Sequence, residues 1–205
     1  MIKNNAQRGR TGLTGLVLAG GQAQRMGGEE KGLIVVQGQS MLAWVLARLV
    51  PQVEDVLISA NRQLDDYARL GHPVVTDAGN SQGPLSGLVA GMQSPGVERL
   101  ITCPCDAPLL PLDLAERLET AREQQSAPIA VAHDGVRLQP LFASIPTSIR
   151  GELASFLAAG ESRVMAWLER HSVAIADFSD QREAFVNINT PESLAELEAN
   201  WSASP

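Results

Sequence analysis

The chain has little cysteine, no excess of positive charge and no long hydrophobic run. Only Cys103 and Cys105 are cysteines, and their spacing fits neither a C-x-x-C motif nor a zinc site. Two reduced thiols are typical of the cytoplasm, so we expect a cytoplasmic protein. The formal net charge of −7 argues against a general nucleic-acid binder, although one bound nucleotide needs only local positive charge.

Signals for membrane insertion and export are also missing. No apolar run approaches the roughly 18–20 residues that a membrane-spanning helix needs, so we expect no membrane association. Residues 1–12 are polar and basic and lack the apolar segment of a signal peptide, which predicts a disordered N-terminal extension. No low-complexity linker or internal repeat divides the remainder, so we expect one domain over residues 13–200.

Apolar runs of strand length alternate with helical patterns along the chain. The alternation predicts an α/β fold of three layers, Rossmann-like, with a mostly parallel (mixed) central sheet covered on both faces. The expected strands are Leu13–Leu18, Val53–Ser59, Pro73–Thr76, Leu100–Cys103 and Pro128–His133. The expected helices between them are a helix capped by Ser40 and ended by Pro51, then Asp65–Leu70, Leu85–Met92 and Pro111–Gln125.

The second half of the chain is less regular. We expect a strand over Arg137–Ile145 that Pro140 interrupts, and two extended segments at Ser172–Phe178 and Ala184–Ile188. Thr190 and Pro191 are expected to open a last helix. Two further helical patterns cover Pro146–Ala159 and Arg163–Arg170. The Leu85–Met92 pattern is rich in small residues, which predicts close packing of that helix on the sheet.

Glycines and cations follow the first expected strand. The segment Leu18-Ala19-Gly20-Gly21 leads to Arg25 and then to Lys31. Glycine lets backbone N–H groups approach phosphate oxygens, and the two cations can neutralise phosphate charge. The spacing matches neither a Walker A loop nor a G-x-G-x-x-G fingerprint. It therefore predicts a phosphate-binding loop of a third kind.

Other polar residues also follow expected strands. Ligands of open α/β sheets bind outside the carboxyl ends of strands, which places Ser59, Asn61, Asp77 and Asp106 in the same region. Asp106 lies in a proline-flanked loop, and one or two carboxylates with phosphates and water usually hold Mg²⁺. Asp106 is thus a candidate metal ligand and Asp77 a candidate for a ribose or base contact. A turn or cap is the alternative for each.

Four separated blocks occur in the same order in one known family. They are Leu18–Lys31, Gly83–Gly87, Pro104–Pro108 and Phe185–Glu192. On these blocks the chain resembles the molybdenum cofactor guanylyltransferases, within the superfamily of nucleotide-diphospho-sugar transferases, from about Leu13 to about Leu197. The resemblance implies that GTP and molybdopterin (the molybdenum cofactor) react with Mg²⁺ as cofactor to give molybdopterin guanine dinucleotide and pyrophosphate. It also implies partners in molybdenum insertion and molybdoenzyme maturation.

The resemblance also implies residue roles, with the GTP site in residues 13–110 and the acceptor side mainly in 111–200. Arg25, Lys31 and Asp106 would be catalytic, the cations by holding the triphosphate and Asp106 by carrying the metal. The attacking phosphate is already anionic, so no strong general base is expected. The nucleotide contacts would come from Leu18, Ala19, Gly20, Gly21, Lys31, Ser59, Asn61, Asp77 and Asp106. The acceptor candidates are Asn187, Asn189, His133 and Arg163.

Three alternatives stay open at this point. A sister transferase that uses CTP has a similar first loop, although Gly20-Gly21 favours GTP because the sister loop more often has Ala-Ala-Gly. A sugar-phosphate nucleotidyltransferase would share the loop and differ in its acceptor. A non-catalytic nucleotide-binding protein would have no need of Arg25, Lys31 and Asp106 together. Ser59 and Gln139 stand where the family often has Asn and His.

Overall fold

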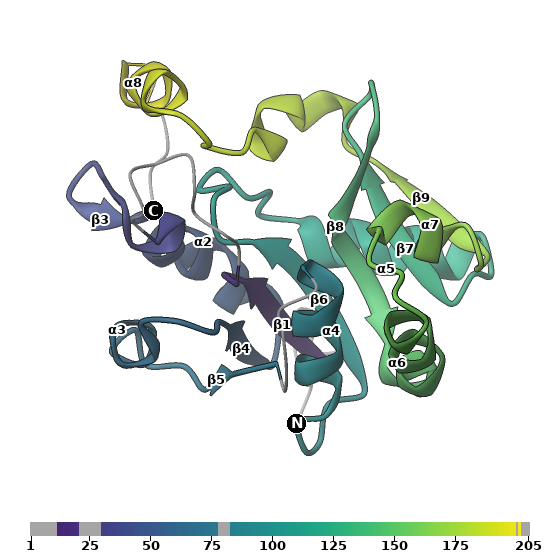
Figure 1. Cartoon of the computed structure of the whole chain (residues 1–205). Coiled ribbons are helices and arrows are strands. Elements are labelled where there is room, and N and C mark those ends of the chain that lie inside the picture. Colours follow the sequence, from purple (N-terminus) through teal and green to yellow (C-terminus); the bar gives the residue numbers. More distant parts are fainter. Residues whose placement is uncertain (1–11, 21–29, 78–82, 200, 202–205) are drawn as a thin grey trace, which may run out of the picture.

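Seven strands form the central sheet of the computed structural model, which describes residues 12–20, 30–77, 83–199 and 201. Their order is β5-β4-β1-β6-β8-β7-β9 (Figure 1). Only β8 runs antiparallel to its neighbours β6 and β7, so the expected mostly parallel, mixed sheet is confirmed. The strands are β1 (Leu13–Leu18), β4 (Asp55–Ser59), β5 (Val74–Val75), β6 (Arg99–Pro104), β7 (Ile129–His133), β8 (Leu138–Pro146) and β9 (Val173–Asp177).

Helices cover both faces of this sheet and enclose two hydrophobic cores. On β1, Val17 belongs to one core and Leu16 to the other, because successive side chains of a strand point to opposite faces. The first core lies under α2 (Met41–Leu49), α3 (Leu64–Ala68) and α5 (Leu114–Gln124). The second lies under α4 (Pro84–Met92), α6 (Arg150–Ala158) and α7 (Val164–Leu168).

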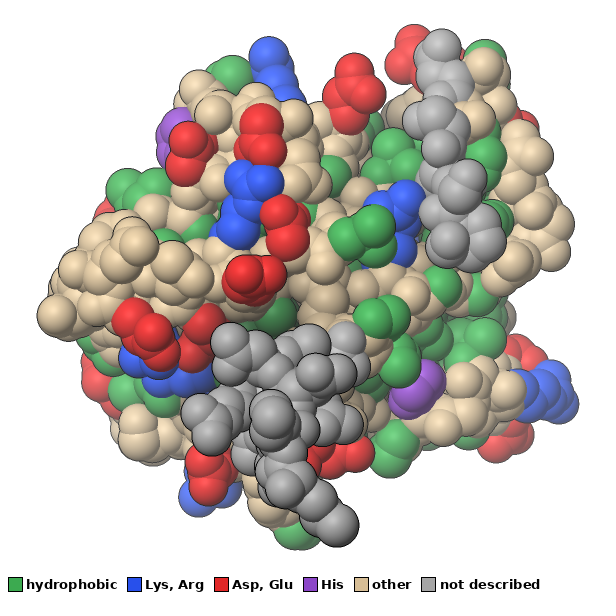
Figure 2. Space-filling model, turned by 180° about the vertical axis from the view of Figure 1, so that it is seen from behind, with side chains coloured by type: hydrophobic (Ala, Val, Ile, Leu, Met, Phe, Trp, Pro, Cys, Tyr) green, Lys and Arg blue, Asp and Glu red, His purple; other side chains and the backbone are tan. Residues whose placement is uncertain are grey.

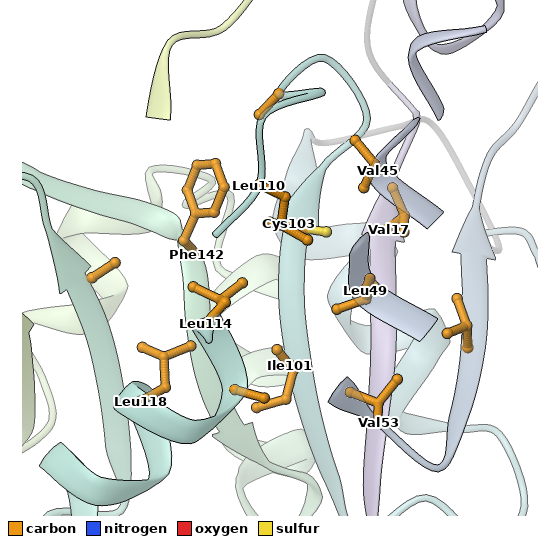
Figure 3. Close-up of a cluster of buried hydrophobic side chains, with 14 of the residues drawn as sticks. Val17, Val45, Leu49, Val53, Ile101, Cys103, Leu110, Leu114, Leu118 and Phe142 are labelled. Atoms are coloured by element: carbon orange, nitrogen blue, oxygen red, sulfur yellow. The ribbon is translucent and has the colours of Figure 1, made fainter. Parts of the chain in front are cut away.

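The first core joins the two halves of the sheet. Figure 3 shows Val17 and Cys103 on neighbouring strands, with Leu49 of α2 on one side and Leu114 of α5 on the other. All four side chains are fully buried. Ser40 caps α2 as expected, because its Oγ accepts a hydrogen bond from the Ala43 N–H at 3.2 Å.

Glycines let α4 lie against the sheet, as its composition predicts. A Cβ added at Gly91 would lie 2.8 Å from a methyl group of Leu16 on β1 and 3.4 Å from Leu100 on β6. A Cβ at Gly87 would lie 2.3 Å from the Ser59 hydroxyl at the end of β4. Gly87 and Gly91 therefore let the backbone of α4 approach the sheet more closely than side chains at these positions would allow.

The strand expected over Arg137–Ile145 is present as β8, and Pro140 interrupts its pairing with β7 as expected. Val131 pairs with Ala143 and Ala132 with Gln139, so residues 140–142 bulge out of the ladder, where the missing N–H of proline costs little. The extended segment expected over Ala184–Ile188 needs correction. Its first two residues end the 3-10 helix η4 (Ser179–Phe185), and no strand is formed there.

The helix expected from Pro111 begins three residues later, at Leu114. Asp113 precedes it and directs its carboxylate to Arg117 and Gln181 instead of capping the helix. The two-residue strands β2 (Val35–Val36) and β3 (Gln39–Ser40) form a small hairpin that the sequence did not predict. The remaining short elements are 3-10 turns at η1 (Lys31–Leu33), η2 (Val50–Gln52) and η3 (Thr147–Ile149).

The C-terminal segment returns to the first half of the chain. Helix α8 (Pro191–Ala199) lies beside α2 and β3 (Figure 1), and the Trp44 and Trp201 rings meet edge to face at 4.8 Å. Thr190 caps α8 as expected, since its Oγ1 accepts from the Ser193 N–H at 3.2 Å. The Ile188 N–H donates to the Asp106 carbonyl at 2.9 Å. This contact fixes the segment between η4 and α8 against the end of β6.

The outer edge of β9 is bonded by a side chain. Gln125 donates from Nε2 to the Ile175 carbonyl at 2.9 Å and accepts from the Ile175 N–H at 3.0 Å.

On the face that Figure 2 shows, most Lys and Arg side chains outside the grey residues lie beside Asp or Glu side chains. Among the described helices, none is both long and apolar enough to cross a bilayer.

The packing of α4 predicts a contrast between two glycine substitutions. Gly91→Ala should lower the free energy of unfolding by roughly 1–3 kcal/mol, because Leu16 and Leu100 must move. Gly151→Ala in α6 is the control: no atom lies within 4 Å of the added Cβ, so stability should rise by about 0.5–1 kcal/mol. Urea denaturation measures both, and equal effects would contradict the close packing.

Candidate active site

A cavity of about 290 Å³ opens where the carboxyl ends of β1, β4 and β6 meet. The position agrees with the rule for ligands of open α/β sheets. The described residues that line it include most of the predicted site residues. These are Leu18, Ala19, Gly20, Lys31, Ser59, Asn61, Asp77, Asp106, Asn187 and Asn189.

Lys31 is the point where three distant parts of the chain meet. Its Nζ lies 3.3 Å from Oδ2 of Asp106 and also donates to Oδ1 of Asn189. Lys31 comes from η1, Asp106 from the end of β6, and Asn189 from the segment before α8. The side chain of Lys31 is 26% exposed, so its charge is partly desolvated yet reaches the cavity.

Asp106 is a buried carboxylate whose two oxygens have different surroundings. Burial raises the pKa of its carboxyl group above the ordinary value, and the charge and hydrogen bond of Lys31 partly offset that rise. Its Oδ1 is buried and accepts no hydrogen bond within the described part of the chain. An anionic oxygen in that condition favours a cation or a hydrogen-bond donor brought in by a ligand.

A second carboxylate faces the same cavity from β5. Asp77 also has a buried Oδ1 without a hydrogen-bond partner among the described residues. Its backbone N–H donates to the side-chain oxygen of Asn61 at 3.1 Å, which ties the segment after β4 to the end of β5. Asp77 and Asn61 therefore form one polar wall of the cavity.

The N-terminus of α4 supplies another wall. Gly83 has φ +85°, a conformation that favours glycine, and Pro84 occupies the first helical position. Gly83, Pro84 and Gly87 line the cavity, so the partial positive charge of the helix N-terminus faces it. Ser59 is buried beneath Gly87, which explains a small side chain there.

The family comparison agrees with this geometry. The profile of the MobA-like NTP transferase domain matches residues 15–197, nearly all of the described chain. The chain belongs to this family. It is a nucleotidyltransferase, and the resemblance stated from the four sequence blocks is confirmed.

Relatives and solved structures are similar to this chain over most of its length. A molybdenum cofactor guanylyltransferase from Shewanella sediminis is 44% identical over 183 residues, 89% of this chain and 93% of that protein. Molybdopterin-guanine dinucleotide biosynthesis protein A from Archaeoglobus fulgidus superposes with a TM-score of 0.76 at 22% identity, over 91% and 97% of the two chains. A 4-diphosphocytidyl-2C-methyl-D-erythritol synthase from Anaerococcus prevotii gives 0.70 at 12% identity, over 98% and 100%.

Not every predicted site residue can be placed in the cavity. Gly21 and Arg25 lie outside the described residues. His133 lies at the turn after β7, where its Nδ1 accepts from the Gly135 N–H at 3.1 Å, and Arg163 is exposed before α7. Neither lines the cavity, so an acceptor role for either stays a prediction.

Gln139 has an internal role instead of facing the cavity. It is buried and donates from Nε2 to the Asp134 carboxylate at 2.6 Å. Burial alone would raise the pKa of Asp134, but hydrogen bonds from the Arg137 and Val136 backbone and from Gln139 lower it to about 2. The Gln139–Asp134 contact thus holds the turn between β7 and β8.

Few side chains of the kinds that ligate metals lie together in the described part of the chain. In residues 12–20, 30–77, 83–199 and 201, no group of three or more His, Cys, Asp or Glu side chains is placed to hold a metal ion. A site of one carboxylate completed by phosphates and water, as expected for Asp106, needs no such group.

The position of Lys31 predicts a loss of nucleotide affinity when its charge is removed. Lys31→Ala should weaken the binding of a nucleoside triphosphate roughly 10- to 100-fold, because a charged hydrogen bond to phosphate is lost. Isothermal titration measures the affinity. Arg69→Ala is the control, since the Arg69 side chain is 76% exposed and pairs with Asp66 outside the cavity. Unchanged affinity in Lys31→Ala would exclude a phosphate contact.

Proposed function

We propose that this protein transfers GMP from GTP to the molybdenum cofactor, giving molybdopterin guanine dinucleotide and pyrophosphate. The observation that carries the proposal is the meeting of Lys31, Asp106 and Asn189 in one cavity of a MobA-like chain. A relative named molybdenum cofactor guanylyltransferase shares 44% of its residues along nearly the whole length. That name favours GTP over CTP and molybdopterin over a sugar phosphate.

The reaction is a displacement at phosphorus. An oxygen of the molybdopterin phosphate attacks the α-phosphorus of GTP, a new P–O bond forms, and the bond to the bridging oxygen of the β-phosphate breaks. Pyrophosphate leaves with the electron pair. Because the nucleophile is already an anion, the protein needs to align the two phosphates and stabilise charge. Lys31, and Arg25 in the loop before it, would neutralise the departing pyrophosphate.

Mg²⁺ fits the donor atoms of the cavity. The Oδ1 of Asp106, without a hydrogen-bond partner among the described residues, is a hard oxygen ligand, and Asp106 lines the cavity where the phosphates are expected. Asp106 would hold the ion, and bound Mg²⁺ would supply charge neutralisation on the phosphate oxygens. Lys31 keeps the other carboxylate oxygen in place at 3.3 Å.

The cavity walls suggest where each substrate lies. The backbone of Leu18 to Gly20 and the side chains of Ser59, Asn61 and Asp77 would contact the nucleoside. Asn187 and Asn189 line the same cavity from the C-terminal segment and would contact the pterin through their amides. Partners in molybdenum insertion and molybdoenzyme maturation, and a cytoplasmic location, stay predictions.

A nucleotide panel tests the proposed function. Purified protein mixed with Mg²⁺, molybdopterin and each of the four NTPs should release pyrophosphate with GTP at a rate at least about tenfold above the others, an energy difference of about 1.4 kcal/mol. Mass spectrometry should find the guanine dinucleotide. Release with CTP but not GTP would contradict the guanylyl assignment.

The role of Asp106 can be tested without disturbing its shape. Asp106→Asn keeps the backbone contact to Ile188 and should lower turnover on the order of 10²–10³-fold. Thermal stability should change little, because a neutral amide is easier to bury than a carboxylate and the Lys31 side chain, 26% exposed, can be hydrated when it loses its charged partner. Asp66→Asn on exposed α3 is the matched control. Turnover near that of the unaltered protein would remove the Asp106 carboxylate from the chemistry.

A further inference from the structure

A second buried carboxylate lies next to Lys31 and has no role in the scheme above. The side chain of Glu30 is only 4% exposed, and its Oε1 lies 3.4 Å from Nε of Arg62. That distance and geometry make an ion pair without a hydrogen bond to Oε1. Arg62 directly follows Asn61, so the pair joins the start of η1 to the nucleoside side of the cavity.

Tyr67 of α3 packs against the same turn at Gly32. Its ring is fully buried, and a Cβ added at Gly32 would lie 3.2 Å from its hydroxyl oxygen and 3.3 Å from the Cβ of Cys105. Burial, followed by the charges of Cys105 and Glu30, raises the pKa of the Tyr67 hydroxyl. The hydroxyl oxygen is buried and has no hydrogen-bond partner among the described residues.

The backbone between these anchors is a single tight turn. The Leu33 N–H donates to the Glu30 carbonyl at 2.9 Å, and the Ile34 N–H donates to the Lys31 carbonyl at 3.2 Å. Glu30 holds the turn on one side of Lys31, and Gly32 is pressed on Tyr67 on the other. The Lys31 side chain extends from this turn toward Asp106 and Asn189.

We propose that Glu30 is a positioning residue that, through its ion pair with Arg62, fixes Lys31 at the triphosphate and couples the nucleoside segment Ser59–Asn61 to the phosphate cation. Tyr67 supports the same turn by packing at Gly32. The inference rests on the proposed function. Its physical basis is that a buried carboxylate needs a paired cation, and the only ion pair described for Glu30 comes from the loop that carries Asn61. A shift of that loop would move Arg62, then Glu30 through the ion pair, and then Lys31, which follows Glu30 in the chain.

The first test separates phosphate positioning from simple stabilisation. Glu30→Gln and Arg62→Gln should each weaken GTP binding about 5- to 30-fold, and neither should change GMP binding more than twofold, because GMP lacks the β- and γ-phosphates. Arg62→Lys should restore part of the GTP affinity. In a Lys31→Ala background, Glu30→Gln should have no further effect. Equal losses for GTP and GMP, or additive losses with Lys31→Ala, would overturn the proposal.

A second test does not depend on any substrate. Lys3 and Lys31 are the two lysines of the chain, so an acylating reagent followed by peptide mass spectrometry reports on the Lys31 amine directly. Arg62→Gln should increase the acylation rate of Lys31 at least about threefold, because the amine leaves Asp106 and Asn189 more often. The Arg62 side chain is 66% exposed, so this variant should fold even if Glu30→Gln does not.

Arg69→Gln is the matched control, since it removes an exposed arginine seven residues away that pairs with Asp66. It should leave both GTP affinity and Lys31 acylation unchanged. If the unaltered protein fails to bind GTP, the proposed function is wrong, and the acylation rates still decide the inference. An unchanged Lys31 rate in Arg62→Gln would overturn it.

Discussion

The ion pair between Lys31 and Asp106 is the interaction on which the site depends. A carboxylate as buried as that of Asp106 is costly unless a cation accompanies it, and Lys31 is the cation at 3.3 Å. To place the two side chains together, the fold must bring η1 to the end of β6. The parallel order of β4, β1 and β6 does so by aligning their carboxyl ends. The return of the C-terminal segment then adds Asn189.

The partly desolvated charges of Lys31 and Asp106 suit phosphate-transfer chemistry. Desolvated charges that are held before the substrate arrives need little reorganisation when charge develops on a leaving group. The unpaired oxygens of Asp77 and Asp106 fit the same logic, because each keeps a strong acceptor available for a ligand. Glu30 and Arg62 extend the network outward, so the site is built from linked charges and not from isolated groups.

Local sequence patterns account for most of the predictions that the structure confirms. β1 was predicted with its observed bounds, the Ser40 and Thr190 caps follow from side-chain chemistry, and the strand-end rule brought Ser59, Asp77 and Asp106 together. What failed depends on tertiary contacts. Phe185 lies in a helical turn because it packs between Phe142 and Phe178. The interruption at Pro140 was predicted, but the bulge that accommodates it depends on the pairing of β8 with β7. The Glu30–Arg62 pair joins residues 32 positions apart, and neither spacing nor periodicity indicates it.

The Gln125 amide on the edge of β9 has a consequence for the behaviour of the protein in concentrated solution. An open strand edge invites a strand of another molecule to add to the sheet, and fibrous aggregation begins in this way. At Ile175 both backbone groups are already taken by Gln125, so an incoming strand must first displace a side chain of its host. The opposite edge, β5, is only two residues long. The two edges of the sheet are therefore protected by different means, a side-chain amide at Ile175 on one edge and a very short strand on the other.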